Sequence, residues 1–254
     1  MRMEVNAAYG GMAETMASIP DRFEAEGTLL YKGRNTIKRF DDGGVPYVVK
    51  RFRRPMFVQR VVYTFFRPGK ARRAYHYGLH LKQLGFATPE SIAYLETWSG
   101  GLLDQSYYIC RVDDAPPICE RLNDPEEFDR VMAADLARML ANLHQKGVLH
   151  GDFNSTNVLY RPQDDGHYAF SLIDNNRMRF CKGVPSLTDC MENMTRFTGR
   201  MDLFEFVAKE YVAARGLPSS AVEQLIAQKQ RHDARWVRRK RFTGWLKKWF
   251  KKWF

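Results

Sequence analysis

The feature that most constrains this chain is a polar loop inside residues 148–160, which two short apolar runs enclose. Within this loop, Asp152 follows His150 by two positions and Asn157 follows Asp152 by five. Loops held between regular elements often carry the functional side chains of a protein. A short loop rich in Asn, Asp and Ser can also be a simple turn. The other motifs of the chain have to decide between these two interpretations.

The composition is that of an ordinary soluble chain. Its 254 residues, 44% of them hydrophobic, can form one large domain or two lobes. No apolar run approaches the ~18 residues that span a bilayer, and the start, with Arg2 and Glu4, lacks the features of a signal peptide. We therefore expect a cytoplasmic protein. The cysteines show no metal-ligand spacing and are expected to be reduced structural thiols: Cys110, Cys119, Cys181 and Cys190.

The net charge of +11 is concentrated in two segments. The chain after Asp233 contains nine Lys and Arg residues and no acid, which leaves only +2 for everything before it. Residues 43–89 contain ten Lys and Arg residues and again no Asp or Glu. The signal for a nucleic-acid or membrane partner is therefore local rather than a property of the whole chain.

The chain after Gly27 has the pattern of antiparallel strands. Runs rich in Val, Ile, Tyr and Phe alternate with Gly-bearing turns, which predicts a meander with strands at residues 28–31, 36–40 and 46–52. Two further strands are predicted on either side of a Ser-Gly-Gly turn, at residues 91–96 and 106–111. Residues 1–24 are equally compatible with a short helix and with a loose arm.

Two helices are predicted between the meander and the later strands. Apolar residues recur at helical spacing over residues 55–67, with arginines between and beside them. This helix either packs on the small lobe or touches an anionic surface. The second helix is predicted over residues 71–84, with Gly85 as its C-cap.

The pattern changes from strands to helices at residues 113–117, which we interpret as a hinge between two lobes. A long amphipathic helix then leads into the polar loop. Asp124 has the features of its N-cap, with Pro125 at the first helical position and Glu127 at the third.

Two short strands follow the polar loop, at residues 158–160 and 168–173. A turn separates them, so they predict a hairpin, and the second strand ends at Asp174. Such a hairpin would bring Asn157 and Asp174 to the same end.

The order of Lys50, Asp152, Asn157 and Asp174 in this context resembles that of the protein-kinase-like phosphotransferases. The resemblance implies a two-lobed α+β fold. Residues 1–112 would form the antiparallel-sheet N-lobe with its basic helix, and residues 118–235 the mainly helical C-lobe. The implied site consists of Asp152 as catalytic base, with His150 and Lys50 in the catalytic set; Asn157 and Asp174 as magnesium ligands; and Lys50, Lys32, Gly33, Arg34 and Asn35 around the nucleotide phosphates.

Within this superfamily the chain resembles the bacterial lipopolysaccharide kinases, which phosphorylate Kdo or heptose in the inner core. The likeness extends over about residues 27–216, and the segments that carry it are residues 32–35, 48–50, 85–90, 150–157 and 173–177. This resemblance implies ATP and Mg²⁺ as cofactors and a lipid-linked sugar as acceptor.

Two departures from the protein-kinase pattern affect the expected substrate and activity. Residues 43–89 offer no Glu to pair with Lys50, and Ala74 or His76 occupies the corresponding positions. Asp174 is followed by Asn-Asn rather than Phe-Gly, and no Ala-Pro-Glu motif follows. The segment between Asp174 and a predicted helix near Ser186 is too short for a peptide-binding platform, which favours a small or glycolipid substrate.

The C-terminal tail, residues 236–254, has the composition of a helix that lies in a membrane interface. Its aromatic residues recur at helical spacing and lysines lie between them: Trp245, Trp249, Phe250, Trp253 and Phe254, with Lys247, Lys248, Lys251 and Lys252. This predicts a peripheral protein on the inner face of the inner membrane, attracted to anionic lipids. A nucleic-acid contact or a helix docked on the core are the alternatives.

The resulting hypothesis is an ATP-dependent kinase of a Kdo-type or heptose sugar in the lipopolysaccharide inner core. A catalytically weak, pseudokinase-like module bound to the membrane is the alternative, because Lys50 lacks the usual acidic partner. A protein kinase is a third possibility.

Overall fold

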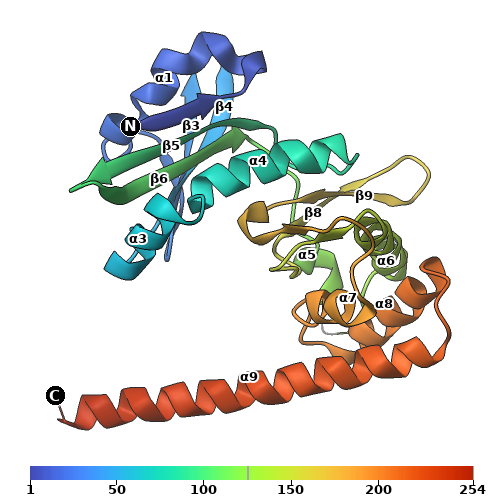
Figure 1. Ribbon diagram of the computed structural model, residues 1–254. Coiled ribbons are helices and arrows are strands. Elements are labelled where there is room, and N and C mark those ends of the chain that lie inside the picture. Colours follow the sequence, from blue (N-terminus) through green and yellow to red (C-terminus); the bar gives the residue numbers. More distant parts are fainter. Residues whose placement is uncertain (125, 254) are drawn as a thin grey trace. The chain divides into compact units, whose positions relative to one another are not determined.

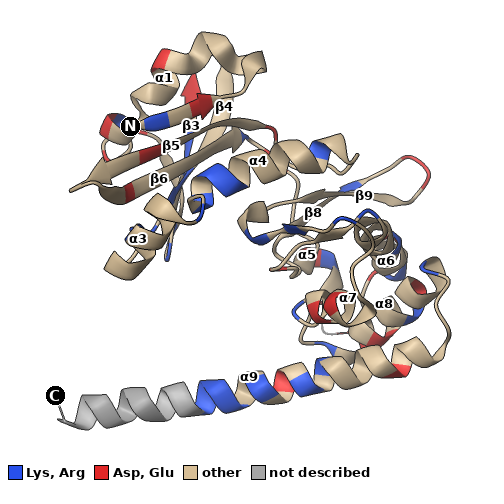
Figure 2. Ribbon diagram, viewed as in Figure 1, with Lys and Arg blue, Asp and Glu red and all other residues tan. Residues whose placement is uncertain are grey.

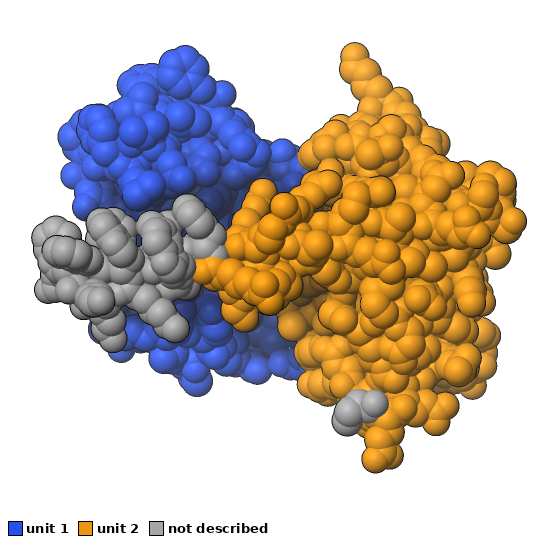
Figure 3. Space-filling model, turned by 90° about the horizontal axis from the view of Figure 1, so that it is seen from below, with its two compact units in different colours: residues 1–115, 171–178 blue, residues 116–170, 179–254 orange. Residues whose placement is uncertain are grey.

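The computed structural model describes residues 1–124 and 126–253, with residues 242–253 as backbone only. The chain forms two compact units, which are described separately (Figure 3). Unit 1 comprises residues 1–115 and 171–178, and unit 2 comprises residues 116–170 and those from 179 onward. The first division falls inside the segment 113–117. The return of residues 171–178 to unit 1 was not predicted, and it places Asp174 in the unit that contains Lys50.

Unit 1 is built on a six-stranded antiparallel sheet with the order β1-β5-β6-β4-β3-β2. The predicted meander and the later pair of strands are confirmed. The strands are β1 (Arg2–Val5), β2 (Thr28–Lys32), β3 (Thr36–Asp42), β4 (Val45–Phe52), β5 (Ser91–Ser99) and β6 (Leu102–Arg111). Alternation along β4 sends Tyr47 and Val49 to one face of the sheet, and Lys50 and Phe52 to the other.

The N-terminal segment covers the Tyr47 face of the sheet (Figure 1). It forms η1 (Ala7–Met12), α1 (Ala13–Ala17) and α2 (Ile19–Arg22) after β1. Met16, Ile19 and Phe23 are completely buried against the sheet, and β1 pairs with β5. The segment that the sequence left open between a helix and a loose arm is therefore an integral part of the core.

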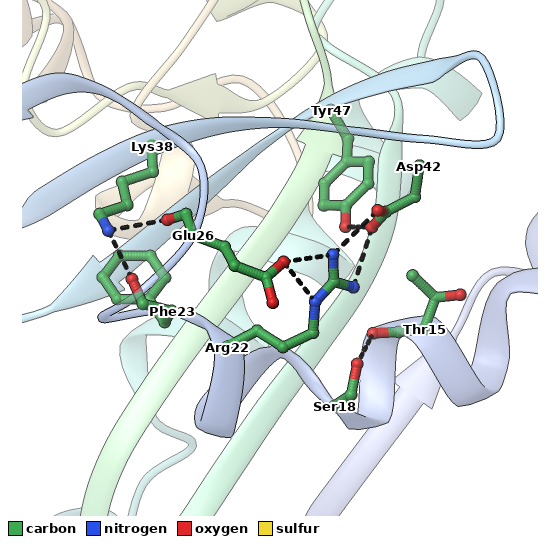
Figure 4. A network of polar contacts seen from close by, with 8 residues as sticks. All are labelled: Thr15, Ser18, Arg22, Phe23, Glu26, Lys38, Asp42 and Tyr47. Carbon is green, nitrogen blue, oxygen red and sulfur yellow. Dashed lines mark hydrogen bonds and ion pairs between the residues drawn. The ribbon is translucent and has the colours of Figure 1, made fainter.

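A network around Arg22 ties this segment to the sheet (Figure 4). The Arg22 guanidinium donates two hydrogen bonds to the Asp42 carboxylate, at 2.9 and 3.1 Å, and one to Glu26 at 2.8 Å. Tyr47 Oη donates to the same Asp42 side chain. These contacts, with Arg22 foremost, lower the pKa of Asp42 and keep the end of β3 attached to α2.

Two helices follow β4. The predicted helices at 55–67 and 71–84 are α3 (Phe57–Phe65) and α4 (Lys70–Gln83). α4 covers the second face of the sheet, where its buried residues Ala71, Ala74 and Tyr75 pack with Phe52 of β4. α3 has no buried residue at all.

Unit 2 is mainly helical. Its core lies between α6 and α8, where Leu136, Leu140, Val207 and Tyr211 are buried. The elements in chain order are α5 (Cys119–Leu122), α6 (Arg130–Gln145), β7 (Val148–Leu149), β8 (Val158–Pro162), β9 (Tyr168–Leu172), β10 (Arg179–Phe180), α7 (Leu187–Met194), α8 (Met201–Ala214) and α9 (Ser220–Trp253), with the end of β9 and η2 (Asn175–Arg177) reaching into unit 1. The predicted hairpin is present as the β8–β9 sheet.

The helix before the polar loop begins later than predicted. Its N-cap is Asp129, whose carboxylate accepts a hydrogen bond from Met132 N at 2.9 Å. Asp124 instead accepts bonds from the backbone of Glu126 and Glu127, at 2.9 and 3.3 Å. The Asp124 motif therefore closes a local turn, because an Asx turn and an N-cap use the same hydrogen bonds.

The long helix α9 contains the whole segment from Ser220 to Trp253, so the predicted tail at 236–254 continues a helix that begins earlier. The structure describes residues 242–253 as backbone only, so the aromatic and lysine side chains predicted to contact a membrane, from Trp245 onward, are not described. No helix in the part of the chain that the structure describes is both long and apolar enough to cross a bilayer.

Candidate active site

Lys50 lies on the α4 face of the sheet, and its ammonium group contacts Asp174. Lys50 Nζ is 2.7 Å from Asp174 Oδ1, with exposed side-chain fractions of 16% for Lys50 and 31% for Asp174. A charged hydrogen bond between two partly shielded groups is stronger than one on the open surface. The pair therefore positions Lys50 within unit 1.

Asp174 is placed by an unusual backbone conformation. Its φ of 56° and ψ of 43° lie in the left-handed region, and it is the one non-glycine residue with positive φ among residues 1–124 and 126–253. Asp tolerates this region better than most residues because its short side chain can bond locally. Asn176 Nδ2 donates such a bond to Asp174 Oδ1. The chain thus turns sharply from β9 into η2 with the carboxylate held at the bend.

The positions on α4 where an acid was sought for Lys50 serve the fold instead. Ala74 is buried against Phe52 and Tyr75, and His76 Nε2 lies 3.4 Å from Glu4. At Gly78 an added Cβ would be 2.5 Å from Ser91 Oγ and 3.2 Å from Asn175 Nδ2. Close packing of α4 against β5 and η2 thus excludes a larger side chain at Gly78, and Asp174 supplies the carboxylate.

Lys70 is a further cation of this site that the sequence did not single out. Partial burial lowers its pKa, as do the neighbouring guanidinium groups of Arg34, Arg177 and Arg73, whereas the Asp174 carboxylate acts in the opposite direction. Several positive charges therefore lie near Lys70, with the Asp174 carboxylate as the one negative charge among the groups that influence it. Such a cluster suits a polyanion such as a triphosphate. In the sequence, the absence of Asp and Glu from residues 43–89 was the one indication of this group of cations.

The turn between β2 and β3, which contains Lys32, Gly33, Arg34 and Asn35, is fixed by its own contacts. Gly33 N donates to Asn35 O at 3.0 Å, and a Cβ at Gly33 would collide with the ring of Tyr31. Asn35 Oδ1 accepts a hydrogen bond from Arg53 N at 3.2 Å. The side chain of Asn35 therefore anchors the turn to the end of β4, and a role of this turn in covering phosphates stays a prediction.

Asp152 and Asn157 are brought together in unit 2. Asn157 Nδ2 and Asn154 Nδ2 both donate to the backbone oxygen of Asp152, at 3.0 Å. Because the Asn157 amide nitrogen is held by the backbone, its oxygen is the atom suited to a cation. Arg196 Nη1 lies 3.2 Å from Asp152 Oδ1. The loop therefore presents a carboxylate beside a positive charge.

His150 lies beneath this loop. It is fully buried, and its ring packs edge-on against Phe153 with 6.1 Å between the ring centroids. Phe153 in turn packs on Phe197. We assign His150 a role in positioning the loop, because a buried ring does not reach a substrate.

A second buried histidine supports the loop from the core. Gly151 N donates to Asn193 Oδ1 at 3.0 Å, and Asn193 Nδ2 donates to His144 Nε2 at 3.1 Å. His144 Nδ1 is 2.8 Å from Tyr211 Oη. Burial lowers the pKa of His144 to about 3, so the ring is neutral and can accept from Asn193. The sequence did not single out His144, because its contacts with Asn193 and Tyr211 join positions 49 and 67 residues apart.

A pocket lies next to the loop in unit 2. It is lined by Leu149, Gly151, Phe153, Arg179, Asp189, Glu192, Asn193 and Arg196. Arg179 pairs with Asp189 at 3.3 Å. The arginines of this pocket can bind anions, and its carboxylates and the Asn193 amide can bind hydroxyls. The ring of Phe153 contributes an apolar part of the wall.

The predicted site residues thus fall into two groups. Lys50 and Asp174 contact each other in unit 1, and Asp152 and Asn157 contact each other in unit 2. Asp174 and Asn157, expected at the same end of a hairpin, belong to different units.

The antiparallel sheet unit, the mainly helical unit and these two pairs define a phosphotransferase with a protein-kinase-like fold. The model of the lipopolysaccharide kinase (Kdo/WaaP) family matches residues 27–201. The chain therefore belongs to this family of kinases of the lipopolysaccharide core. No curated protein matches its sequence.

Among solved structures, the chain is similar to WaaP in a complex with acyl carrier protein. The TM-score is 0.62 at 17% sequence identity, and the match covers 92% of this chain and 99% of the other. The likeness confirms the predicted two-lobed kinase fold.

Proposed function

We propose that this protein transfers the γ-phosphoryl group of ATP to a hydroxyl of a Kdo-type, or heptose, sugar of the lipopolysaccharide inner core. The observation that carries the proposal is the Lys50–Asp174 ion pair, together with the group of cations near Lys70. In a kinase, catalysis is mostly the positioning and charge stabilisation of phosphates. This cluster offers both in unit 1.

Asp152 is the residue that would orient the acceptor hydroxyl and take its proton. Its backbone is held by Asn154 and Asn157, and its carboxylate is directed by Arg196. Lys50 and Lys70 would hold the phosphates of the nucleotide, because both are cations of unit 1, where Lys50 contacts Asp174 and Lys70 feels its charge. His150 and His144 act only through the loop that they support.

The Asp174 carboxylate of unit 1 and the Asn157 amide oxygen of unit 2 are each hard oxygen donors of the kind that Mg²⁺ prefers, so each would be suited to hold the ion. When bound, the ion would neutralise charge on the phosphates.

The acceptor is inferred from Arg196. Kdo is a sugar acid, and the Arg196 guanidinium at the pocket next to Asp152 suits a carboxylate or phosphate on the acceptor. The pocket is formed by α7, by the short strands β7 and β10 and by the polar loop, and its polar lining suits the hydroxyls of a sugar. A neutral heptose would need a phosphate or another anion nearby to use this arginine.

We place the reaction at the cytoplasmic face of the inner membrane. The basis is the composition of the tail, in which lysines and aromatic residues alternate at helical spacing. An enzyme acting on a lipid-linked sugar gains from staying close to the bilayer, because its acceptor diffuses in two dimensions there.

The test is transfer of labelled phosphate from ATP to two purified acceptors, one ending in Kdo and one carrying heptose. Asp152→Asn should reduce transfer by about 100-fold or more, while Asp164→Asn, in an exposed turn, should leave it unchanged. Wild-type transfer by Asp152→Asn would exclude the mechanism.

Magnesium ATP should also raise the melting temperature of the protein, since a ligand of the native state stabilises it. A protein that neither labels an acceptor nor responds to magnesium ATP would instead be the catalytically weak membrane module.

A further inference from the structure

The helix α3 turns its apolar side chains away from the protein. Within and beside it, Met56, Phe57, Val58, Phe65 and Phe66 are 68–80% exposed. Large apolar side chains do lie singly on protein surfaces, but a contiguous group is uncommon and marks an interaction site. Phe57, Val58, Val62 and Phe65 follow helical spacing, so they share one face of α3.

The polar side of α3 faces its own unit. Arg60 Nε donates to Leu103 O and Arg60 Nη2 to Ser99 O, both at 2.7 Å. Thr64, one turn further along, accepts from Leu103 N at 2.9 Å. The helix is therefore attached to the β5–β6 hairpin by polar groups. A surface helix normally turns its apolar face to the core and its polar face to solvent, and α3 does the opposite. Figure 1 shows α3 beside β6 in unit 1.

The surroundings of this face are basic. Arg53, Arg54 and Arg67 flank α3 and are exposed. Asp104 of β6 pairs with Arg54 at 2.6 Å, which leaves the border with a net positive charge. Figure 2 shows α3 itself largely uncharged, with Lys and Arg on the neighbouring β4 and α4 and an acidic position on β6. An apolar face with a basic border matches the boundary between acyl chains and anionic headgroups.

We propose that α3 is a membrane-inserting element of this protein, which places its phenylalanines among the lipids of an anionic bilayer. Charge complementarity selects this occupant. The lysine-rich tail and a second copy of α3 are both basic, so each would be repelled by the arginines around this face. The element is separate from the tail and does not rest on the identity of the sugar acceptor.

The test follows amide hydrogen exchange in the full chain with vesicles of phosphatidylcholine and of phosphatidylcholine mixed with phosphatidylglycerol. Exchange in peptides that cover residues 55–67 should slow by about tenfold or more with anionic vesicles. The variant Phe57→Ser/Val58→Ser/Phe65→Ser/Phe66→Ser should lose this protection and bind the vesicles about tenfold more weakly. The matched control is Leu29→Ser/Leu30→Ser, which removes apolar side chains exposed by 49% and 54% from β2 of the same unit. It should behave like the wild type.

Unchanged exchange over α3 with wild-type vesicle affinity of the α3 variant would overturn the proposal, and is the result expected if α3 docks a protein instead. Equal protection by both kinds of vesicle would overturn the requirement for anionic lipid. Phosphate transfer to an acceptor dispersed in detergent should be normal in the α3 variant, so this test and that of the proposed function fail independently.

Discussion

Lys50 Nζ lies 2.7 Å from Asp174 Oδ1, and this ion pair joins β4 to the segment after β9 within one compact unit. The contact supplies the acid that α4 lacks. Lys70, which Arg34, Arg177, Arg73 and Asp174 all influence, adds a further cation to the same unit.

Breaking this pair should remove phosphate transfer without unfolding the protein. Lys50→Met is expected to lower kcat/KM for ATP by about 100-fold or more, because a preorganised cation no longer stabilises the phosphates. Asp174→Asn should abolish the response to magnesium. Lys82→Met is the control, because the Lys82 side chain is 42% exposed and lies 3.9 Å from Glu90. Near-normal steady-state kinetics of Lys50→Met would show that the pair is only structural.

Lys70 should stabilise the complex with nucleotide but lower the stability of the ligand-free protein. The lowered pKa shows that the charged form is disfavoured in the folded state, first by burial and then by the nearby arginines. Lys70→Met should therefore raise the melting temperature of the ligand-free protein, by about 2–4 °C, and reduce the further rise caused by magnesium ATP. Thermal unfolding with and without nucleotide measures both effects. A lower melting temperature in the free variant would contradict the argument.

Arg196 should determine binding of the acceptor rather than of ATP. Arg196→Ala is expected to raise KM for an anionic sugar acceptor by about tenfold, with a smaller effect on KM for ATP, because it removes the cation next to Asp152. Arg196→Lys should recover part of the loss. Two-substrate kinetics would separate these parameters, and an equal change in both KM values would assign Arg196 to positioning the loop.

His144 should make the stability of the protein depend on pH below neutrality. Its pKa is about 3 in the folded protein, against 6.5 for an ordinary histidine. Between these values the unfolded chain binds a proton that the folded protein does not. Stability is thus complete above pH 6.5 and falls as the pH is lowered, with a slope approaching about 1.4 kcal/mol per pH unit for this one group.

Urea unfolding between pH 7 and pH 4.5 would measure this slope. His144→Gln removes the titration and keeps a side chain that can bond to Asn193, so its slope should be smaller than that of the wild type. Identical slopes would show that other groups govern the acid response.

Several features of the fold could be predicted from local sequence. The alternation in 46–52 predicts a strand with Lys50 near its end, because side chains of a strand point to opposite faces in turn. Asp152 and Asn157 lie five positions apart in one predicted loop, and the structure adds a hydrogen bond from Asn157 Nδ2 to Asp152 O. Contacts over five residues are decided by a single turn, so a local pattern is sufficient for them.

Contacts between segments that are far apart in the sequence could not be predicted from local patterns. The N-terminal segment gave no periodic signal, yet β1 pairs with β5 and Phe23 is buried on the sheet. The outward direction of the apolar face of α3 follows from Arg60 and Thr64 bonding to the β5–β6 hairpin, although the helical pattern alone fits either direction.

The sequence by itself determined which chemical groups this protein has and in what order: a strand lysine, a loop with an aspartate and an asparagine, and an aspartate after a hairpin. The tertiary structure decided that Lys50 finds its carboxylate in Asp174, 124 positions away, rather than on α4. The reason is physical: periodicity reports the environment of each side chain over a few residues, whereas an ion pair between distant segments exists only once both are packed in the same compact unit.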